Sequence, residues 1–169
     1  MKLLKNQVSV DSSGIAAQGY CFGGAVVLNM ARLGLDLDGV VSFHGSLASP
    51  IKAEPGQIKA RIQVYTGGAD PFVPTEQVAG LVTEMQQAEA DLTLVSFPGV
   101  QHSFTNPGAD AIADQFDIPL ADDESAAARS WQGTLALPLS SKTSPFTFSL
   151  PMRLMPSCTL LPPLHHWIT

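Results

Sequence analysis

The sequence predicts a single α/β domain, in which a parallel sheet has helices on both faces. Short apolar runs of strand length alternate along the chain with segments of helical periodicity, and turn residues separate them. Such alternation is typical of βαβ units, whose strands lie parallel. A chain of 169 residues is long enough for one domain with a buried core, and two domains are not expected.

The first elements each carry a local signal. "GIAAQG" (14–19) is a short buried-strand candidate. Residues 24–33 have helical spacing, and Gly34 is a suitable helix stop. "DGVVSFHG" (38–45) and "RIQVYTGGAD" (61–70) are continuous apolar runs that predict the next two strands.

The following elements continue the alternation. Residues 74–90 predict an amphipathic helix that starts at Pro74, and "LTLVSFPG" (92–99) predicts a strand followed by a long loop. Residues 124–137 predict a further helix, in which Trp131 and Leu135 stand four apart. The apolar face of the 74–90 helix is expected to contain Val78, Leu81, Val82 and Met85.

The composition changes at the end of the last predicted helix. No Asp or Glu follows Glu124, and six prolines interrupt residues 138–169. Proline at this density excludes a regular helix or a central strand. We therefore divide the chain into an α/β domain at 1–137 and an irregular, proline-rich tail at 138–169.

Composition also narrows the class of protein. The net charge is −6 and no cluster of Lys and Arg occurs, so nucleic acid is not an expected partner. A membrane-spanning helix needs roughly 18 or more apolar residues in a row, and no apolar run here is that long. Residues 1–14 lack the apolar core of a signal peptide. With only two cysteines and no disulfide framework, the expected location is the cytoplasm.

"GYCFG" (19–23) has the form of a nucleophile elbow, G-x-Nu-x-G, with cysteine as the nucleophile. The turn from strand to helix is so sharp that side chains two residues before and after the nucleophile would collide, and Gly19 and Gly23 remove that collision. The helix N-terminus favours a thiolate at Cys21, and the Phe22 backbone N–H is the expected oxyanion donor. The alternative is that Cys21 is an inert, buried core residue.

Two further residues fit the role of partners for Cys21. A cysteine nucleophile needs a base, and the base needs an orienting acid; hydrolases of this type carry nucleophile, acid and histidine in that chain order. Asp70 and His102 follow Cys21 in this order, each just after a predicted strand. Alone, Asp70 could be a turn residue and His102 an ordinary loop histidine. His44, also at a strand end, is interpreted as a hydrogen-bonded structural histidine, with a place lining the site as the alternative.

No metal or cofactor is expected. Cys158, His165 and His166 resemble half a metal site by residue type only, since further ligands at a usual spacing do not accompany them.

The motifs "GYCFGGAVV", "VVSFHG", "TGGADPFVP" and "FPGVQHSFTNPGAD" resemble the dienelactone hydrolase family of the α/β-hydrolase superfamily. The resemblance implies a Cys21, Asp70 and His102 triad that hydrolyses a small-molecule carboxylic ester or lactone through a thioester. It runs from about Ile15 to Leu137, roughly the second half of a family domain. The family's N-terminal strands and its second oxyanion donor are therefore expected to be missing, giving a partial α/β-hydrolase fold.

Two consequences follow from this expectation. Ile15 to Gln18 would form an exposed edge with an uncovered apolar face, through which the chain could self-associate. The chain could also be a catalytically silent remnant of such a hydrolase, or a binding or redox-sensing module that uses Cys21 alone.

Overall fold

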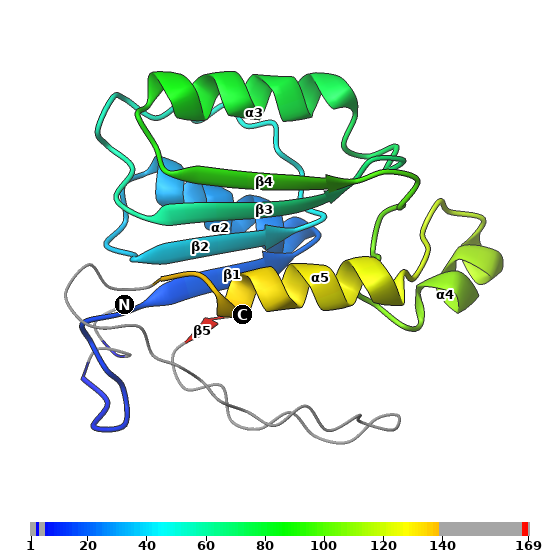
Figure 1. The fold of residues 1–169 in the computed structure, drawn as a ribbon, viewed down its shortest axis with the longest axis horizontal. Coiled ribbons are helices and arrows are strands. Elements are labelled where there is room, and N and C mark those ends of the chain that lie inside the picture. The colour runs from blue at the N-terminus through cyan, green and yellow to red at the C-terminus, as the bar shows by residue number, and fades with distance from the viewer. Residues whose placement is uncertain (1–2, 4–5, 139–166, 169) are drawn as a thin grey trace.

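The structure is a computed structural model that describes residue 3, residues 6–138 and residues 167–168. Its centre is a parallel sheet with the strand order β4-β3-β2-β1-β5 (Figure 1). The four strands predicted between residues 14 and 99 are present, each within a few residues of its expected ends. A fifth, two-residue strand lies at 167–168, in the tail that was predicted to be irregular. The strands are β1 (Ala16–Tyr20), β2 (Gly39–Phe43), β3 (Arg61–Gly67), β4 (Leu92–Phe97) and β5 (Trp167–Ile168).

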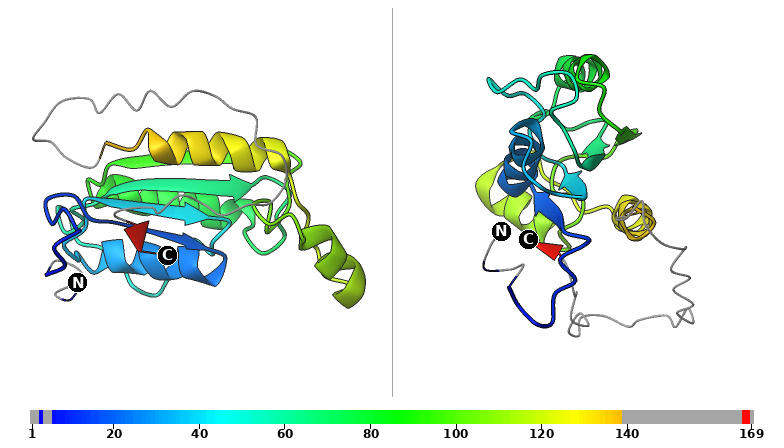
Figure 2. Two further views of the ribbon diagram at one scale, coloured as in Figure 1. Left: turned by 90° about the horizontal axis from the view of Figure 1, so that it is seen from below. Right: turned by 90° about the vertical axis from the view of Figure 1, so that its left-hand side faces the viewer.

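The helices cover both faces of the sheet, as the α/β prediction requires. In Figure 2, α2 and α3 lie against one face and α5 lies against the other. Among the described residues, no helix is both long enough and apolar enough to cross a membrane. The helices are α2 (Phe22–Arg32), α3 (Thr75–Gln87), α4 (Ala109–Phe116) and α5 (Glu124–Leu135).

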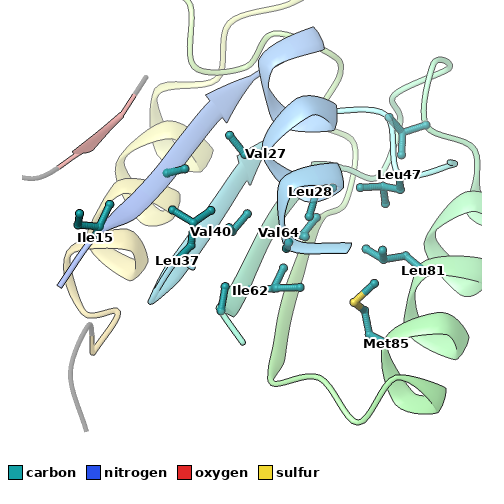
Figure 3. Close-up of a cluster of buried hydrophobic side chains, with 14 residues drawn as sticks. Ile15, Val27, Leu28, Leu37, Val40, Leu47, Ile62, Val64, Leu81 and Met85 are labelled. Carbon is teal, nitrogen blue, oxygen red and sulfur yellow. The ribbon is translucent and has the colours of Figure 1, made fainter. Parts of the chain in front are cut away.

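The larger apolar core lies between the sheet and helices α2 and α3 (Figure 3). Alternate residues of each strand point to this face, because side chains along a strand alternate between the two sides. Figure 3 shows the strand residues meeting the inward faces of both helices. The side chains at this interface include Ile15, Val27, Leu28, Val40, Ile62, Val64, Leu81 and Met85.

The core on the α5 face is aromatic. The rings of Phe43 and Tyr65 stack with centroids 5.4 Å apart, and Tyr20 stacks on Phe43 at 4.7 Å. Phe104, which follows β4 by several residues, is fully buried against Phe97 with an edge-to-face geometry at 5.6 Å. This aromatic layer supports the carboxyl ends of the strands, where the candidate site lies.

A buried ion pair joins the end of α2 to α3. Arg32 Nε donates to Glu84 Oε1 at 2.8 Å, and the Arg32 side chain is only 1% exposed. The same guanidinium donates to the Leu47 carbonyl oxygen at 2.8 Å. Burial alone would raise the pKa of Glu84, but Arg32 and then Lys52 hold it below its ordinary value. Helix α2 is therefore fixed at the end opposite to Cys21.

The predicted apolar face of α3 is correct in part. Leu81 and Met85 are buried as expected, but the prediction for Val82 is wrong, since that residue is 44% exposed. Consecutive helix residues point about 100° apart, so Val82 turns away from the face that carries Leu81. The position that continues the buried face is Glu84, which Arg32 neutralises. Likewise, Leu135 of α5 is 62% exposed, because that helix buries Ser130 and Thr134 instead.

The long loop predicted after residue 99 contains a helix, α4, and the prediction was incomplete there. Of this short helix only Ala109 is buried. Ala109, Ile112 and Phe116 do have helical spacing, but the helix has only eight residues, about two turns, which is too short for periodicity to identify it reliably in sequence. It ends at Asp117, which adopts the left-handed conformation that commonly closes helices (φ 52).

The prediction that residues 15–18 have an uncovered apolar face is wrong, because their side chains are buried. Ile15, Ala16, Ala17 and Gln18 are each no more than 2% exposed. Helix α2 covers one face of β1, and β5 pairs with Ala16 and Ala17 at its edge. The rest of the predicted tail, residues 139–166 and 169, lies outside the described residues, and so do Cys158, His165 and His166.

Self-association through β1 stays a prediction. Its pairing with β5 covers two residues, so within the described part of the chain Gln18, Gly19 and Tyr20 have no strand partner on that side. We expect light scattering at micromolar concentration to show species larger than the monomer, and a chain ending at residue 166 to show more of them. A single sharp monomer peak for both chains would contradict this expectation.

Candidate active site

The structure brings together the three residues that the sequence singled out. Cys21 directly follows β1, Asp70 lies in the loop after β3, and His102 lies in the loop after β4. Cys21 Sγ lies 3.2 Å from His102 Nε2, and His102 Nδ1 lies 2.7 Å from Asp70 Oδ2. In a parallel sheet the carboxyl ends of the strands share one edge, which is why residues 81 positions apart in sequence can meet there.

Cys21 occupies a sharp turn between β1 and α2. Its backbone has φ 52 and ψ −118, a conformation that residues other than glycine seldom adopt. Its N–H donates to the Phe43 carbonyl at 3.0 Å and to His44 Nδ1 at 3.2 Å. Helix α2 begins at the next residue, Phe22, whose backbone N–H has no acceptor within the helix.

The two glycines that flank the elbow are not equivalent. A Cβ added at Gly19 would collide with the backbone carbonyl of Gly23, which cannot move aside without moving α2. A Cβ added at Gly23 would meet nothing within 4 Å, so the expectation that a side chain at Gly23 would itself collide is wrong. The second crowded glycine is Gly24, whose Cβ would lie 2.6 Å from Ser42 Oγ and 3.0 Å from Gly45 Cα.

Asp70 is held rigidly. Its side chain is fully buried, and Oδ1 accepts a hydrogen bond from the Phe72 N–H at 2.8 Å, which leaves Oδ2 for the imidazole of His102. The loop is tied to its neighbour, because the Ala69 N–H donates to the Val100 carbonyl at 2.9 Å. The positions of Asp70 and His102 are therefore fixed relative to each other by main-chain bonds as well as by their own contact.

His102 is 6% exposed, and its partners control its protonation. Burial lowers the pKa of its imidazole, but the hydrogen bonds and charges of Asp70 and Cys21 outweigh burial and hold the pKa above its ordinary value of 6.5. The ring of Phe72 packs edge-to-face on it at 5.2 Å. Its position and electrostatics suit a residue that accepts a proton from Cys21 and keeps it.

His44 fulfils both interpretations given to it from the sequence. It is a hydrogen-bonded, buried histidine, and it also lines the cavity beside Cys21. Burial first, and then the nearby charge of His102, lower the pKa of His44 to about 4, against a partial offset from Asp70. His44 is therefore neutral at physiological pH.

A cavity of about 550 Å³ opens beside Cys21. Aromatic rings form one part of its wall, and the hydroxyl and amide groups of the loop after His102 form another. Among the described residues that line it, none is Lys, Arg, Asp or Glu. The lining residues that matter for a ligand are Tyr20, Phe43, Trp131, Ser103, Thr105 and Asn106.

Sequence reasoning missed several residues of the site. Thr105 bonds to His44, Phe72 packs on His102, and Ser103 has a positive φ of 62 next to the histidine. The only signal for them was their place in the loops after the strands. Within the described part of the chain, no group of three His, Cys, Asp or Glu residues could hold a metal ion.

Comparison with known proteins agrees with this geometry. A family model described as the dienelactone hydrolase family matches residues 1–137. An uncharacterized protein of Caenorhabditis elegans is 35% identical over 138 residues, which are 80% of this chain and 85% of that protein. A dienelactone hydrolase-like promiscuous phosphotriesterase from metagenomic libraries is 35% identical, with a TM-score of 0.69 over 80% of this chain and 56% of that one. The structure named m3DLH is 34% identical, with a TM-score of 0.71 over 80% and 55%.

A parallel sheet with a nucleophile elbow at its carboxyl edge and helices on both faces is the arrangement of an α/β hydrolase. The chain belongs to the dienelactone hydrolase family. It spans a little over half the length of the two solved structures named above.

The two elbow glycines offer a matched pair of substitutions. Gly19→Ala is expected to lower the free energy of unfolding by about 2 kcal/mol or more, because its Cβ meets backbone atoms. Gly23→Ala is expected to be neutral or stabilising, because the position is open and helical. Urea denaturation of both variants checks this, and equal losses for the two would contradict it.

The raised pKa of His102 predicts a dependence of stability on pH. The stabilisation is fully present below about pH 6.5, the pKa of an unfolded histidine, and is lost as the pH rises through the higher folded value. The free energy of unfolding should therefore fall with rising pH above that point, and less steeply in Asp70→Asn.

Urea denaturation at a series of pH values measures this slope. Asp91→Asn, which removes an exposed carboxylate paired with Arg61, is the control and should keep the wild-type slope. Identical slopes in Asp70→Asn and wild type would refute the assignment.

Proposed function

We propose that this chain hydrolyses carboxylic ester or lactone bonds of a small molecule, with Cys21 as nucleophile, His102 as base and Asp70 as orienting acid. The observation that carries the proposal is the unbroken series of contacts from Cys21 Sγ through the His102 ring to Asp70 Oδ2. Membership of the dienelactone hydrolase family supports the class of reaction. No metal or cofactor enters the proposed steps.

The first half of the reaction forms a thioester. His102 Nε2 takes the proton of the Cys21 thiol, and Sγ attacks the carbonyl carbon of the substrate. The negative charge that develops on the carbonyl oxygen is stabilised by the Phe22 backbone N–H at the start of α2. As the C–O bond breaks, the leaving alcohol oxygen takes the proton from His102, and the acyl group remains on sulfur.

The second half releases the acid. His102 removes a proton from water, the hydroxide attacks the thioester carbonyl, and the C–S bond breaks as the proton returns to sulfur. Asp70 accepts the Nδ1–H of His102 throughout, which fixes the ring tautomer and stabilises the imidazolium. Because a free thiol must stay reduced for this chemistry, we place the protein in a reducing compartment such as the cytoplasm.

The cavity beside Cys21 favours an uncharged acyl group. Its aromatic rings can pack on apolar or planar groups, and its hydroxyl and amide groups can bond to neutral oxygens. A carboxylate placed there would find no Lys or Arg among the described lining residues to offset its desolvation. Neutral esters and lactones are therefore the proposed substrates.

Ester turnover by purified protein tests the proposal. With p-nitrophenyl butyrate, Cys21→Ala should lower the rate by about a thousandfold or more, whereas Cys158→Ser, a change of the chain's other cysteine, should not. Acid quenching should leave an acyl group on the Cys21 peptide, visible by mass spectrometry. The mono-p-nitrophenyl ester of succinate, which carries a carboxylate, should react more slowly than the neutral ester.

Two results would decide against the proposal. Turnover that survives in Cys21→Ala would place the reaction elsewhere. A folded wild-type protein without turnover or acyl-enzyme would favour the second interpretation, a catalytically silent member of the family.

A further inference from the structure

Cys21 and His44 are neighbours in the sheet register and share an unusual backbone conformation. Tyr20 and Phe43 are paired across β1 and β2, so the residues that follow them, Cys21 and His44, leave the sheet side by side. Both have positive φ, 52 at Cys21 and 39 at His44. Two adjacent strand ends therefore turn sharply at the same level, and a hydrogen bond joins the two turns.

The hydrogen bonds of His44 define its tautomer. The Cys21 backbone N–H can only donate, so His44 Nδ1, 3.2 Å away, is the acceptor and carries no proton. The proton of the neutral ring is then on Nε2, which donates to Thr105 Oγ1 at 2.9 Å. His44 thus accepts from the nucleophile's turn on one side and donates to the loop after β4 on the other.

The second partner lies on the loop that carries the base. Thr105 follows His102 by three residues, and between them Phe104 is fully buried in the aromatic core. The His44 ring also packs edge-to-face on His102 at 5.0 Å and on Phe104 at 5.2 Å. One buried side chain therefore touches the nucleophile's backbone, the base itself and the loop that holds the base.

We propose that His44 is a positioning residue that holds the turn of Cys21 and the loop of His102 in register. The role rests on the proposed reaction of Cys21, since a register between nucleophile and base matters only if they react together. Removing the acceptor at Nδ1 weakens the hold on the strained turn, and removing the contact at Nε2 frees the loop. Either change loosens the 3.2 Å approach of Cys21 Sγ to His102 Nε2.

The groups around His44 keep its imidazole ring in the neutral form. The titratable groups that face it are Cys21, Tyr20 at a ring distance of 6.1 Å, and His102, with Asp70 acting through its charge. A proton on Nδ1 would oppose the Cys21 N–H and add a second positive charge beside a protonated His102. The lowered pKa of His44, about 4, is consistent with this geometry.

Alkylation of Cys21 by iodoacetamide tests the role without requiring turnover. The rate is measured from about pH 5 to about pH 9 by peptide-resolved mass spectrometry, which separates Cys21 from Cys158 in the same chain. His44→Leu removes both hydrogen bonds, and Thr105→Val removes only the second. His44→Asn keeps an acceptor near the Cys21 N–H and tolerates positive φ. Thr83→Val on the exposed surface of α3 is the matched control.

We expect His44→Leu to slow the alkylation of Cys21 near neutral pH by about tenfold, the rate equivalent of one or two lost hydrogen bonds, and to change its pH profile. Thr105→Val should fall between His44→Leu and wild type. His44→Asn should restore most of the rate, and Thr83→Val should match wild type throughout. Urea denaturation of each variant is measured in parallel.

Wild-type alkylation profiles in Thr105→Val and His44→Leu would overturn the proposal. So would a His44→Asn protein that is as slow as His44→Leu, because the acceptor would then be irrelevant. If His44→Leu fails to fold, Thr105→Val and His44→Asn decide by the same criteria. A wild-type protein that alkylates rapidly in a His44-dependent way but turns over no ester would refute the proposed function and leave this role intact.

Discussion

The site depends on one tight constraint, the reversal of the chain at Cys21. The carbonyl of Gly23 comes so close to Gly19 that no side chain fits at that position, and Cys21 is held at positive φ between them. This close approach lets α2 start immediately after β1 and presents the thiol at the edge of the sheet. The backbone strain is offset by hydrogen bonds to Phe43 and His44 and by the packing of α2 on the sheet.

In the part of the chain that the structure describes, charged side chains are buried in two places, and each charge is compensated by a neighbouring group. Arg32 and Glu84 neutralise each other between α2 and α3, far from the thiol. Asp70 and His102 form the second pair, and there the compensation also raises the pKa of the imidazole. The first pair fixes the helix that carries the elbow, while the second sets the proton affinity of the group facing Cys21. One buried pair therefore has a structural role and the other a chemical role.

Sequence reasoning predicted the features that repeat and those that carry special residues. Apolar runs identified β1 to β4, and "GYCFG" with its chain order of partners identified Cys21, Asp70 and His102, whose side chains meet in the structure. It could not predict α4, which has only eight residues, nor that Val82 points outward next to the buried Glu84. The hydrogen bond between His44 and Thr105 could not be predicted either, because it depends on strand register and on contact between residues 61 positions apart.

The segment that includes α4 leaves the site and returns to it at closely spaced points. The carbonyl of His102 accepts from the Ala121 N–H at 3.1 Å, and that of Phe104 accepts from the Asp123 N–H at 3.0 Å. The chain between these bonds is a long loop whose two ends are held together by main-chain hydrogen bonds. From α4 onward, beyond Thr105 and the residues that line the cavity, its length and sequence can therefore vary without displacing the imidazole, which makes this part the place where a hydrolase of this design can acquire a new cover for its cavity.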